Sequence, residues 1–196
     1  MKIITFVVCV FMVLMMSGCA FTTMQTYQAV GKKTICDEDG RDIGNVVILP
    51  EVAWRNDQKE PEKRKAMAFD EIKRAFQKIP CGSIIRPGGI REFSNWSSVS
   101  EAELLKQFAN EDVDTVILIR IEELTPRLNF TFSLPFLWGG TNEADFRIRA
   151  LSVKTGGVLC DMRVKRITGG PFNIRPAEWS RVELSEALKE IINNGK

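Results

Sequence analysis

Four basic residues on two neighbouring segments have the spacing that most clearly suggests chemistry. They are Arg147 and Arg149 in "ADFRIRALSV", and Arg163 and Lys165 in "VLCDMRVKRIT". Both segments alternate polar with apolar residues around the turn "KTGG", which predicts a β-hairpin with the basic side chains on one face. A three-residue loop over 155–157 would place Arg149 opposite Arg163, and Arg147 opposite Lys165.

Like charges that face each other across a hairpin repel, so we expect an anionic group beside them. The structural interpretation is that carboxylates of the same chain, such as Glu122, Glu123 or Asp145, lie nearby. The functional interpretation is a basic face for lipid headgroups, lipopolysaccharide or an acidic partner. The candidate partner- or anion-binding residues are therefore Arg147, Arg149, Arg163 and Lys165.

Patterns typical of catalysis or metal binding are weak. The 196 residues include no histidine, the side chain most often used as general base and metal ligand. The acidic stretch "DEDGRD" suggests calcium, but an EF-hand loop beginning at Asp37 would place Arg41 and Ile48 at ligand positions. We therefore expect no catalytic residue, no metal and no cofactor.

The first residues have the pattern of a bacterial export signal. Lys2 precedes "IITFVVCVFMVLMM", an apolar run shorter than the roughly 20 residues of a membrane-spanning helix. The run ends in Met16-Ser17-Gly18-Cys19, which resembles the lipobox of bacterial lipoproteins. The resemblance implies a signal peptide over 1–18, cleavage between Gly18 and Cys19, and diacylglycerol and palmitate-like acyl chains on Cys19.

The lipid anchor implied by this resemblance predicts a location. Two or more acyl chains hold a protein stably on a membrane without crossing it. Ala20 follows the cysteine, whereas the sorting rule of lipoproteins associates aspartate at that position with retention in the inner membrane. We therefore expect a bacterial envelope protein at the outer membrane, facing the periplasm.

An apolar stretch, "NFTFSLPFLWGG", is a second candidate contact surface. It is too short to span a bilayer, and its proline and paired glycines argue against a continuous strand. Either its aromatic side chains fold under the sheet or they contact a membrane or a partner. The residues of this candidate loop are Phe130, Phe132, Phe136, Leu137 and Trp138.

Three cysteines lie beyond the lipobox, in a compartment that permits disulfides. Cys160 shares one face of a predicted strand with Val158 and Met162, so we expect a buried thiol. By elimination, Cys36 and Cys81 form the candidate disulfide.

The elements that position these residues follow from periodicity and helix-start signals. After a tether over 19–43, a single α/β domain is expected over 44–194. The predicted order is β-α-β-α-β-β-β-α, which implies a mixed sheet of about five strands with three packed helices. The predicted strands are 45–50, 81–86, 114–124, 144–153 and 158–168, and the helices begin at 61, 100 and 176.

Two longer stretches, "LLKQFANEDVDTVILIRI" and "VKTGGVLCDMRVK", resemble a group of envelope proteins when taken with this order. The group contains the CsgG-like secretion lipoproteins, the penicillin-binding-protein activator lipoproteins and the TolB N-terminal domain. The resemblance covers roughly 45–193, and it implies an α/β scaffold that binds other envelope proteins.

These features together predict a membrane-anchored lipoprotein that acts without catalysis, as a binding or assembly accessory for another envelope component. The 27 basic and 25 acidic residues give no reason to expect nucleic acid as a partner. One alternative is an envelope hydrolase that uses paired carboxylates, although the sequence selects no pair. Another is a carrier of a lipid or small ligand, with an apolar cavity beneath 130–138.

Overall fold

The computed structural model describes residues 21–31, 35, 43–54, 56, 58–77, 84–93, 96–130, 138–171 and 178–193. The strands are β1 (Phe21–Gly31), β2 (Asn45–Val52), β3 (Ile84–Ile90), β4 (Thr115–Phe130), β5 (Trp138–Ser152) and β6 (Val158–Pro171). The helices are α2 (Pro61–Phe76), α3 (Glu101–Phe108) and α4 (Trp179–Asn193), with a short 3-10 helix η1 (Trp96–Ser98).

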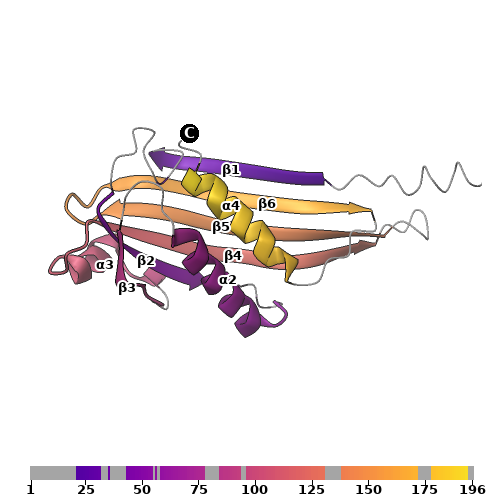
Figure 1. The fold of residues 1–196 in the computed structure, drawn as a ribbon, viewed down its shortest axis with the longest axis horizontal. Coiled ribbons are helices and arrows are strands. Elements are labelled where there is room, and N and C mark those ends of the chain that lie inside the picture. The colour runs from indigo at the N-terminus through magenta and orange to yellow at the C-terminus, as the bar shows by residue number, and fades with distance from the viewer. Residues whose placement is uncertain are drawn as a thin grey trace, which may run out of the picture.

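The strands form one six-stranded sheet in the order β1-β6-β5-β4-β2-β3 (Figure 1). β2 is parallel to β3 and β4, because helices connect these strands, whereas β4, β5, β6 and β1 pair in antiparallel fashion. The predicted α/β class, with a mixed sheet and three helices, is confirmed. The strand beyond the predicted five is β1.

Two hydrophobic cores lie on opposite faces of the sheet. The larger packs α2 and α4 against side chains such as Ile119 and Phe146, and the smaller packs α3 against side chains such as Leu118. In Figure 1, α2 and α4 lie across one face, and α3 lies at one end of the sheet. The second face is therefore covered at the α3 end, and its remaining charged side chains form the surface considered below. None of the described helices is long and apolar enough to cross a membrane.

The start of α3 is fixed by a capping box, as the sequence predicts. The Glu103 amide donates to Ser100 Oγ at 3.3 Å, and the Ser100 amide donates to the Glu103 carboxylate at 3.3 Å. Two amides at the helix start therefore have acceptors. The cap places Glu101 at the first turn, where it meets the sheet.

Replacing Ser100 with alanine is expected to lower the free energy of unfolding by about 1 kcal/mol, because the first turn of α3 loses its side-chain acceptor. Urea unfolding followed by far-UV circular dichroism measures this loss. Ser185→Ala, within α4, is the matched control and is expected to change stability by less than about 0.5 kcal/mol. Equal effects of the two substitutions would contradict the capping role.

β1 lies within the predicted tether, and here the structure differs from the expectation. Residues 21–31 pair with β6 from Phe21↔Gly169 to Gly31↔Cys160. The strand contains no charged residue and mixes threonine, glutamine and apolar side chains, so its alternation is weak in the sequence. Its position at the sheet edge depends on pairing with a strand far along the chain.

The predicted register of the β5–β6 hairpin was wrong by two residues. Gly156 adopts φ +69° and its amide donates to the Ser152 carbonyl at 2.9 Å, which closes a five-residue loop instead of three. Arg149 therefore faces Asp161, and Arg147 faces Arg163. A shift of two residues leaves every side chain on its predicted face.

Candidate functional site

The charged face of the sheet contains three arginines in one row. Arg120 of β4 lies opposite Arg147 of β5, which lies opposite Arg163 of β6. Glu51 of β2 and Tyr27 of β1 occupy the two ends of this row. Side chains directly opposed in a sheet are about 5 Å apart at Cβ, so three adjacent guanidinium groups repel unless anions lie between them.

Carboxylates lie on one diagonal of the β5–β6 hairpin and supply these anions. Arg147 donates from Nε and Nη2 to Asp161, at 2.8 and 2.6 Å. Arg163 donates from Nε and Nη2 to Asp145, at 2.9 Å in both cases. Such two-pronged contacts are among the strongest ion pairs in proteins. Arg147 and Arg163 lie directly opposite each other. Asp161 is two residues along β6 from Arg163, and Asp145 is two residues along β5 from Arg147.

Lys165 follows the same diagonal, and a carboxylate of β4 adds a further pair. Lys165 Nζ lies 2.7 Å from Glu143, and Arg163 Nη2 also lies 2.6 Å from Glu122. The structural interpretation, in which carboxylates of the same chain pair with the basic residues, is confirmed for Asp145 and Glu122. Binding of a partner by this face stays a prediction.

The carboxylates lie deep and the arginines reach outward. The Asp161 side chain is 3% exposed and the Asp145 side chain 8%, whereas those of Arg147 and Arg163 are 47% and 49% exposed. Hydrogen bonds to Asp161 raise the pKa of Arg147, and hydrogen bonds to Asp145 raise the pKa of Arg163. Both arginines are therefore charged, with one edge of the guanidinium on the carboxylate and the rest toward solvent.

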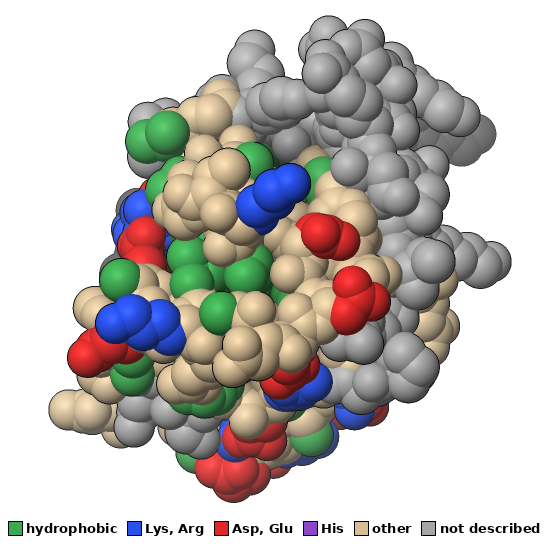
Figure 2. Space-filling model, turned by 90° about the vertical axis from the view of Figure 1, so that its left-hand side faces the viewer, with side chains coloured by type: hydrophobic (Ala, Val, Ile, Leu, Met, Phe, Trp, Pro, Cys, Tyr) green, Lys and Arg blue, Asp and Glu red, His purple; other side chains and the backbone are tan. Residues whose placement is uncertain are grey.

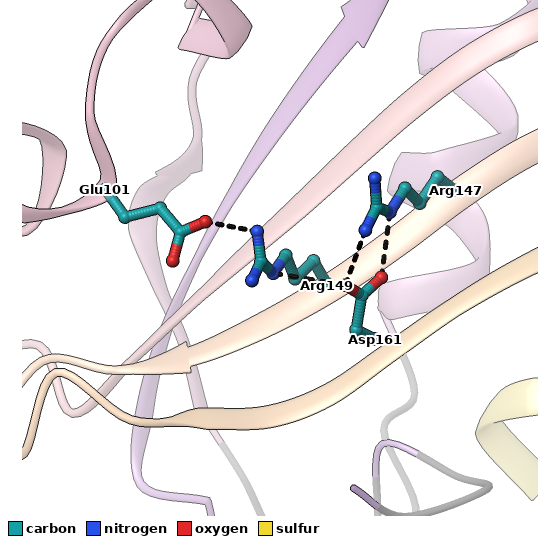
Figure 3. A network of polar contacts seen from close by, with 4 residues as sticks. All are labelled: Glu101, Arg147, Arg149 and Asp161. Carbon is teal, nitrogen blue, oxygen red and sulfur yellow. Dashed lines mark hydrogen bonds and ion pairs between the residues drawn. The ribbon is translucent and has the colours of Figure 1, made fainter. Parts of the chain in front are cut away.

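Arg149 connects this face to α3. It donates from Nη1 to Glu101 on the first turn of α3, and its Nε lies 3.4 Å from Asp161 (Figure 3). The order of contacts is therefore Glu101, Arg149, Asp161, Arg147. One buried carboxylate on β6 holds two arginines of β5.

A cavity of about 190 Å³ lies between this network and α3. Arg120, Arg147 and Arg149 provide its cationic groups, and Glu101 is the one carboxylate in its lining. Its other lining residues are Trp96, Ser97, Val99, Leu104 and Leu118. The cavity therefore combines arginine donors with an aromatic and aliphatic wall.

The wall that carries Trp96 is fixed by Glu51. The Glu51 carboxylate accepts hydrogen bonds from the Ser97 amide at 3.2 Å and from Ser97 Oγ at 2.9 Å. These bonds attach η1 to β2 and hold Trp96 beside the cavity. Glu51 is the cross-strand neighbour of Arg120, yet within the described chain no ion pair joins the two.

Three buried nitrogens of the cavity-lining residues have no hydrogen-bond partner among the described residues. They are Trp96 Nε1, Arg120 Nε and Arg149 Nε, and the last of them lies 3.4 Å from Asp161 in an ion pair. Buried polar groups in proteins nearly always have a partner. An arginine and an indole N–H without acceptors are therefore the chemical signature of this site.

Comparison with known proteins gives structural similarity at low sequence identity. The chain matches no protein-family model and no curated protein. The PelC dodecamer from Paraburkholderia phytofirmans has a TM-score of 0.44 and 11% identity, covering 86% of this chain and 98% of that chain. Lipoprotein GNA1162 from Neisseria meningitidis has a TM-score of 0.35 and 13% identity, covering 76% and 98%.

A putative neuraminyllactose-binding hemagglutinin homolog from Helicobacter pylori has a TM-score of 0.40 and 11% identity, covering 86% of this chain and 86% of that chain. These matches do not assign the chain to a family.

Seen from the end that carries α3, hydrophobic side chains gather near the centre of the surface, with acidic and basic side chains around them (Figure 2). Both apolar and charged groups therefore lie on the surface at this end of the molecule.

Other predicted site residues fall outside the described part of the chain. These are Gly18 and Cys19 of the lipobox, Cys36 and Cys81 of the candidate disulfide, and Phe132, Phe136 and Leu137 of the apolar loop. The backbones of Phe130 and Trp138 form the last pair between β4 and β5. The chain between these two residues connects β4 to β5 in the sequence.

Cys160 and the carboxylates bear on the enzyme alternatives. Burial raises the pKa of the Cys160 thiol to about 12, with Asp161 adding to the effect, so the thiol is protonated and buried as predicted. A hydrolase with paired carboxylates needs two acids across a cleft, and the cavity beside α3 presents Glu101 alone.

The sequence analysis identified Arg147 and Arg149 of the cavity lining and missed the others, of which Arg120 and Trp96 matter most here. Arg120 belongs to the predicted central strand "DTVILIRIEEL", where it is the first charged residue after five apolar or small ones. A polar residue at that position of a buried strand was the available signal. Trp96 lies in a segment without periodicity, so the sequence contained no signal for it.

Proposed function

We propose that this protein is a lipid-anchored component of the bacterial envelope that acts without catalysis, by binding another envelope component through its charged face. The observation that carries this proposal is the row of arginines, in which Arg147 and Arg163 are paired yet half exposed. Exposed arginines with fixed orientation are well suited to acidic groups of a partner. The cavity beside α3 adds a recessed site to the same face.

The lipobox-like sequence supports the location. Ala20 is the one residue between Cys19 and Phe21, where β1 begins. Acylation at Cys19 would therefore attach the membrane directly to the sheet edge, with the outer membrane as the proposed site. The resemblance to the CsgG-like, penicillin-binding-protein activator and TolB N-terminal group supports a binding role.

Removing two exposed positive charges from the face tests the binding role. We expect the double variant Arg147→Gln, Arg163→Gln to lose most of the crosslinked products that the lipidated protein forms in intact envelopes, because its partner loses two guanidinium donors. The measurement is crosslinking of the envelope fraction followed by detection of the protein. Circular dichroism checks that the double variant is folded.

The matched control is Lys73→Gln, Lys189→Gln, which removes two charges from exposed positions on α2 and α4. It is expected to leave the crosslinked products unchanged. A Cys19→Ala variant is expected to be absent from the membrane fraction and to form none of these crosslinked products. Products that persist in the folded arginine variant would refute the charged face as the binding surface.

A further inference from the structure

We propose that the cavity beside α3 binds a single carboxylate group that carries an apolar substituent. It lies on the charged face, so this inference rests on the proposed binding function and specifies its ligand chemistry. The cationic groups are those of Arg120, Arg147 and Arg149, and the apolar wall consists of Trp96, Val99, Leu104 and Leu118.

Two residues of the cavity lining each carry a buried donor without an acceptor. Arg120 Nε and Trp96 Nε1 are buried, and within the described part of the chain neither donates a hydrogen bond. Both residues line the same cavity. A buried donor without an acceptor is costly, and an arginine prefers a planar oxyanion that can accept from two of its nitrogens. The guanidinium groups in the lining therefore favour an oxyanion as the ligand group.

Arg120 is available for this role because its neighbours are already engaged. Arg147 and Arg149 share the Asp161 carboxylate, and Arg149 also donates to Glu101. Glu51, the carboxylate opposite Arg120, accepts from Ser97 instead. Among the described residues, none makes a hydrogen bond or ion pair with the Arg120 side chain, and its Nε is buried without a partner. The middle strands of the sheet thus hold a cation that is free to pair with an added anion.

The charge around the cavity favours a singly charged group. Three arginines are balanced by Glu101, Asp161 and Glu51, which lie in or directly beside the cavity lining. A monoanion adds one negative charge to this balance, whereas a phosphate dianion adds two and is repelled more strongly by the Glu101 carboxylate. A carboxylate therefore fits the electrostatics better than a phosphate.

The size and lining favour a ligand with an apolar part. A volume of about 190 Å³ corresponds to about six waters at roughly 30 Å³ each, which exceeds the space that a lone carboxylate occupies. Trp96 and Leu118 belong to or pack against the smaller core, so they offer apolar surface next to the donors. Small-ligand sites commonly combine such a wall with a few fixed polar groups.

The test uses the mature protein in detergent and three small probes in calorimetric titrations: N-acetylleucine, its uncharged amide and inorganic phosphate. N-acetylleucine is expected to bind saturably at one site, more tightly than phosphate, and the amide is expected not to bind. Arg120→Gln should weaken binding by about tenfold or more, as expected for a lost charge-assisted hydrogen bond. Arg163→Gln, in the same row but outside the lining, should change it by less than about twofold.

A thermal unfolding measurement distinguishes a ligand-binding role of Arg120 from a role in stability. Arg120→Gln is expected to keep or raise the melting temperature, because it removes an unpartnered cation from a row of three. A fall in melting temperature, equal binding of acid and amide, tighter binding of phosphate, or unchanged binding by Arg120→Gln would overturn the proposal. Absence of N-acetylleucine binding would also overturn the proposal of a carboxylate site. The proposed function would still stand in that case if the envelope crosslinks required Arg147 and Arg163.

Discussion

Replacing Asp161 with asparagine is expected to lower the free energy of unfolding by about 2 to 3 kcal/mol, the range for lost hydrogen bonds to charged groups. Its buried carboxylate accepts from Nε and Nη2 of Arg147 and lies 3.4 Å from Nε of Arg149. The amide of asparagine keeps one acceptor and turns a donor toward the guanidinium groups. Urea unfolding, monitored by circular dichroism, measures the change.

The control is Asp70→Asn, at an exposed position on α2, which is expected to change stability by less than about 0.5 kcal/mol. A double-mutant cycle with Arg147→Gln isolates the pair, because the second substitution should cost less once Asp161 has been replaced. Independent, additive effects of the two substitutions would show that the network does not act as one unit. N-acetylleucine binding should weaken in Asp161→Asn, since Arg147 loses both of its hydrogen bonds to Asp161 and Arg149 loses one of its two carboxylate contacts.

The second large effect is expected at Phe146, at the centre of β5. Its side chain is fully buried in the larger core and lies opposite Ile121 and Val164 on the neighbouring strands. Phe146→Ala is expected to lower the free energy of unfolding by about 3 to 5 kcal/mol, because it removes apolar contacts and leaves a cavity. Chemical unfolding measures the loss, and Phe146→Leu should recover most of it.

The two substitutions differ in their effect on the ligand site. Phe146 points to the face of α2 and α4, while the cavity lies on the opposite face beside α3. At temperatures below its unfolding transition, Phe146→Ala is therefore expected to bind N-acetylleucine as the unmodified protein does. Val182→Ala, at an exposed position of α4, serves as the stability control. A cost below about 1 kcal/mol for Phe146→Ala would contradict its place in the core.

The sequence predicts the elements that depend on local signals. The capping box at Ser100, Pro61 at a helix start and the apolar run of β4 each identify an element that the structure contains. β1 was missed because its eleven residues have weak alternation and no flanking turn signal. Its strand conformation depends on hydrogen bonds with β6, which a local pattern does not encode.

The site illustrates the same limit. Arg147 and Arg149 were identified because their alternation within one hairpin is visible in the sequence. Arg120 and Trp96 join them through the β4–β5 register and through η1, contacts between segments separated by many residues. A pocket of this kind is built from residues that are far apart in the sequence. The sequence therefore predicted that basic side chains gather on this face, but it did not predict which residues line the pocket.

The diagonal ion pairs also affect which register of the β5–β6 hairpin is more stable. A slip of two residues keeps every apolar side chain facing α2 and α4, so the hydrophobic core cannot reject it. The slipped hairpin would place Arg149 opposite Arg163 and Arg147 opposite Lys165, and it would separate Arg147 from Asp161. The ion pairs of the polar face therefore favour the observed register over the slipped one. The same charged side chains form the surface that we propose for binding.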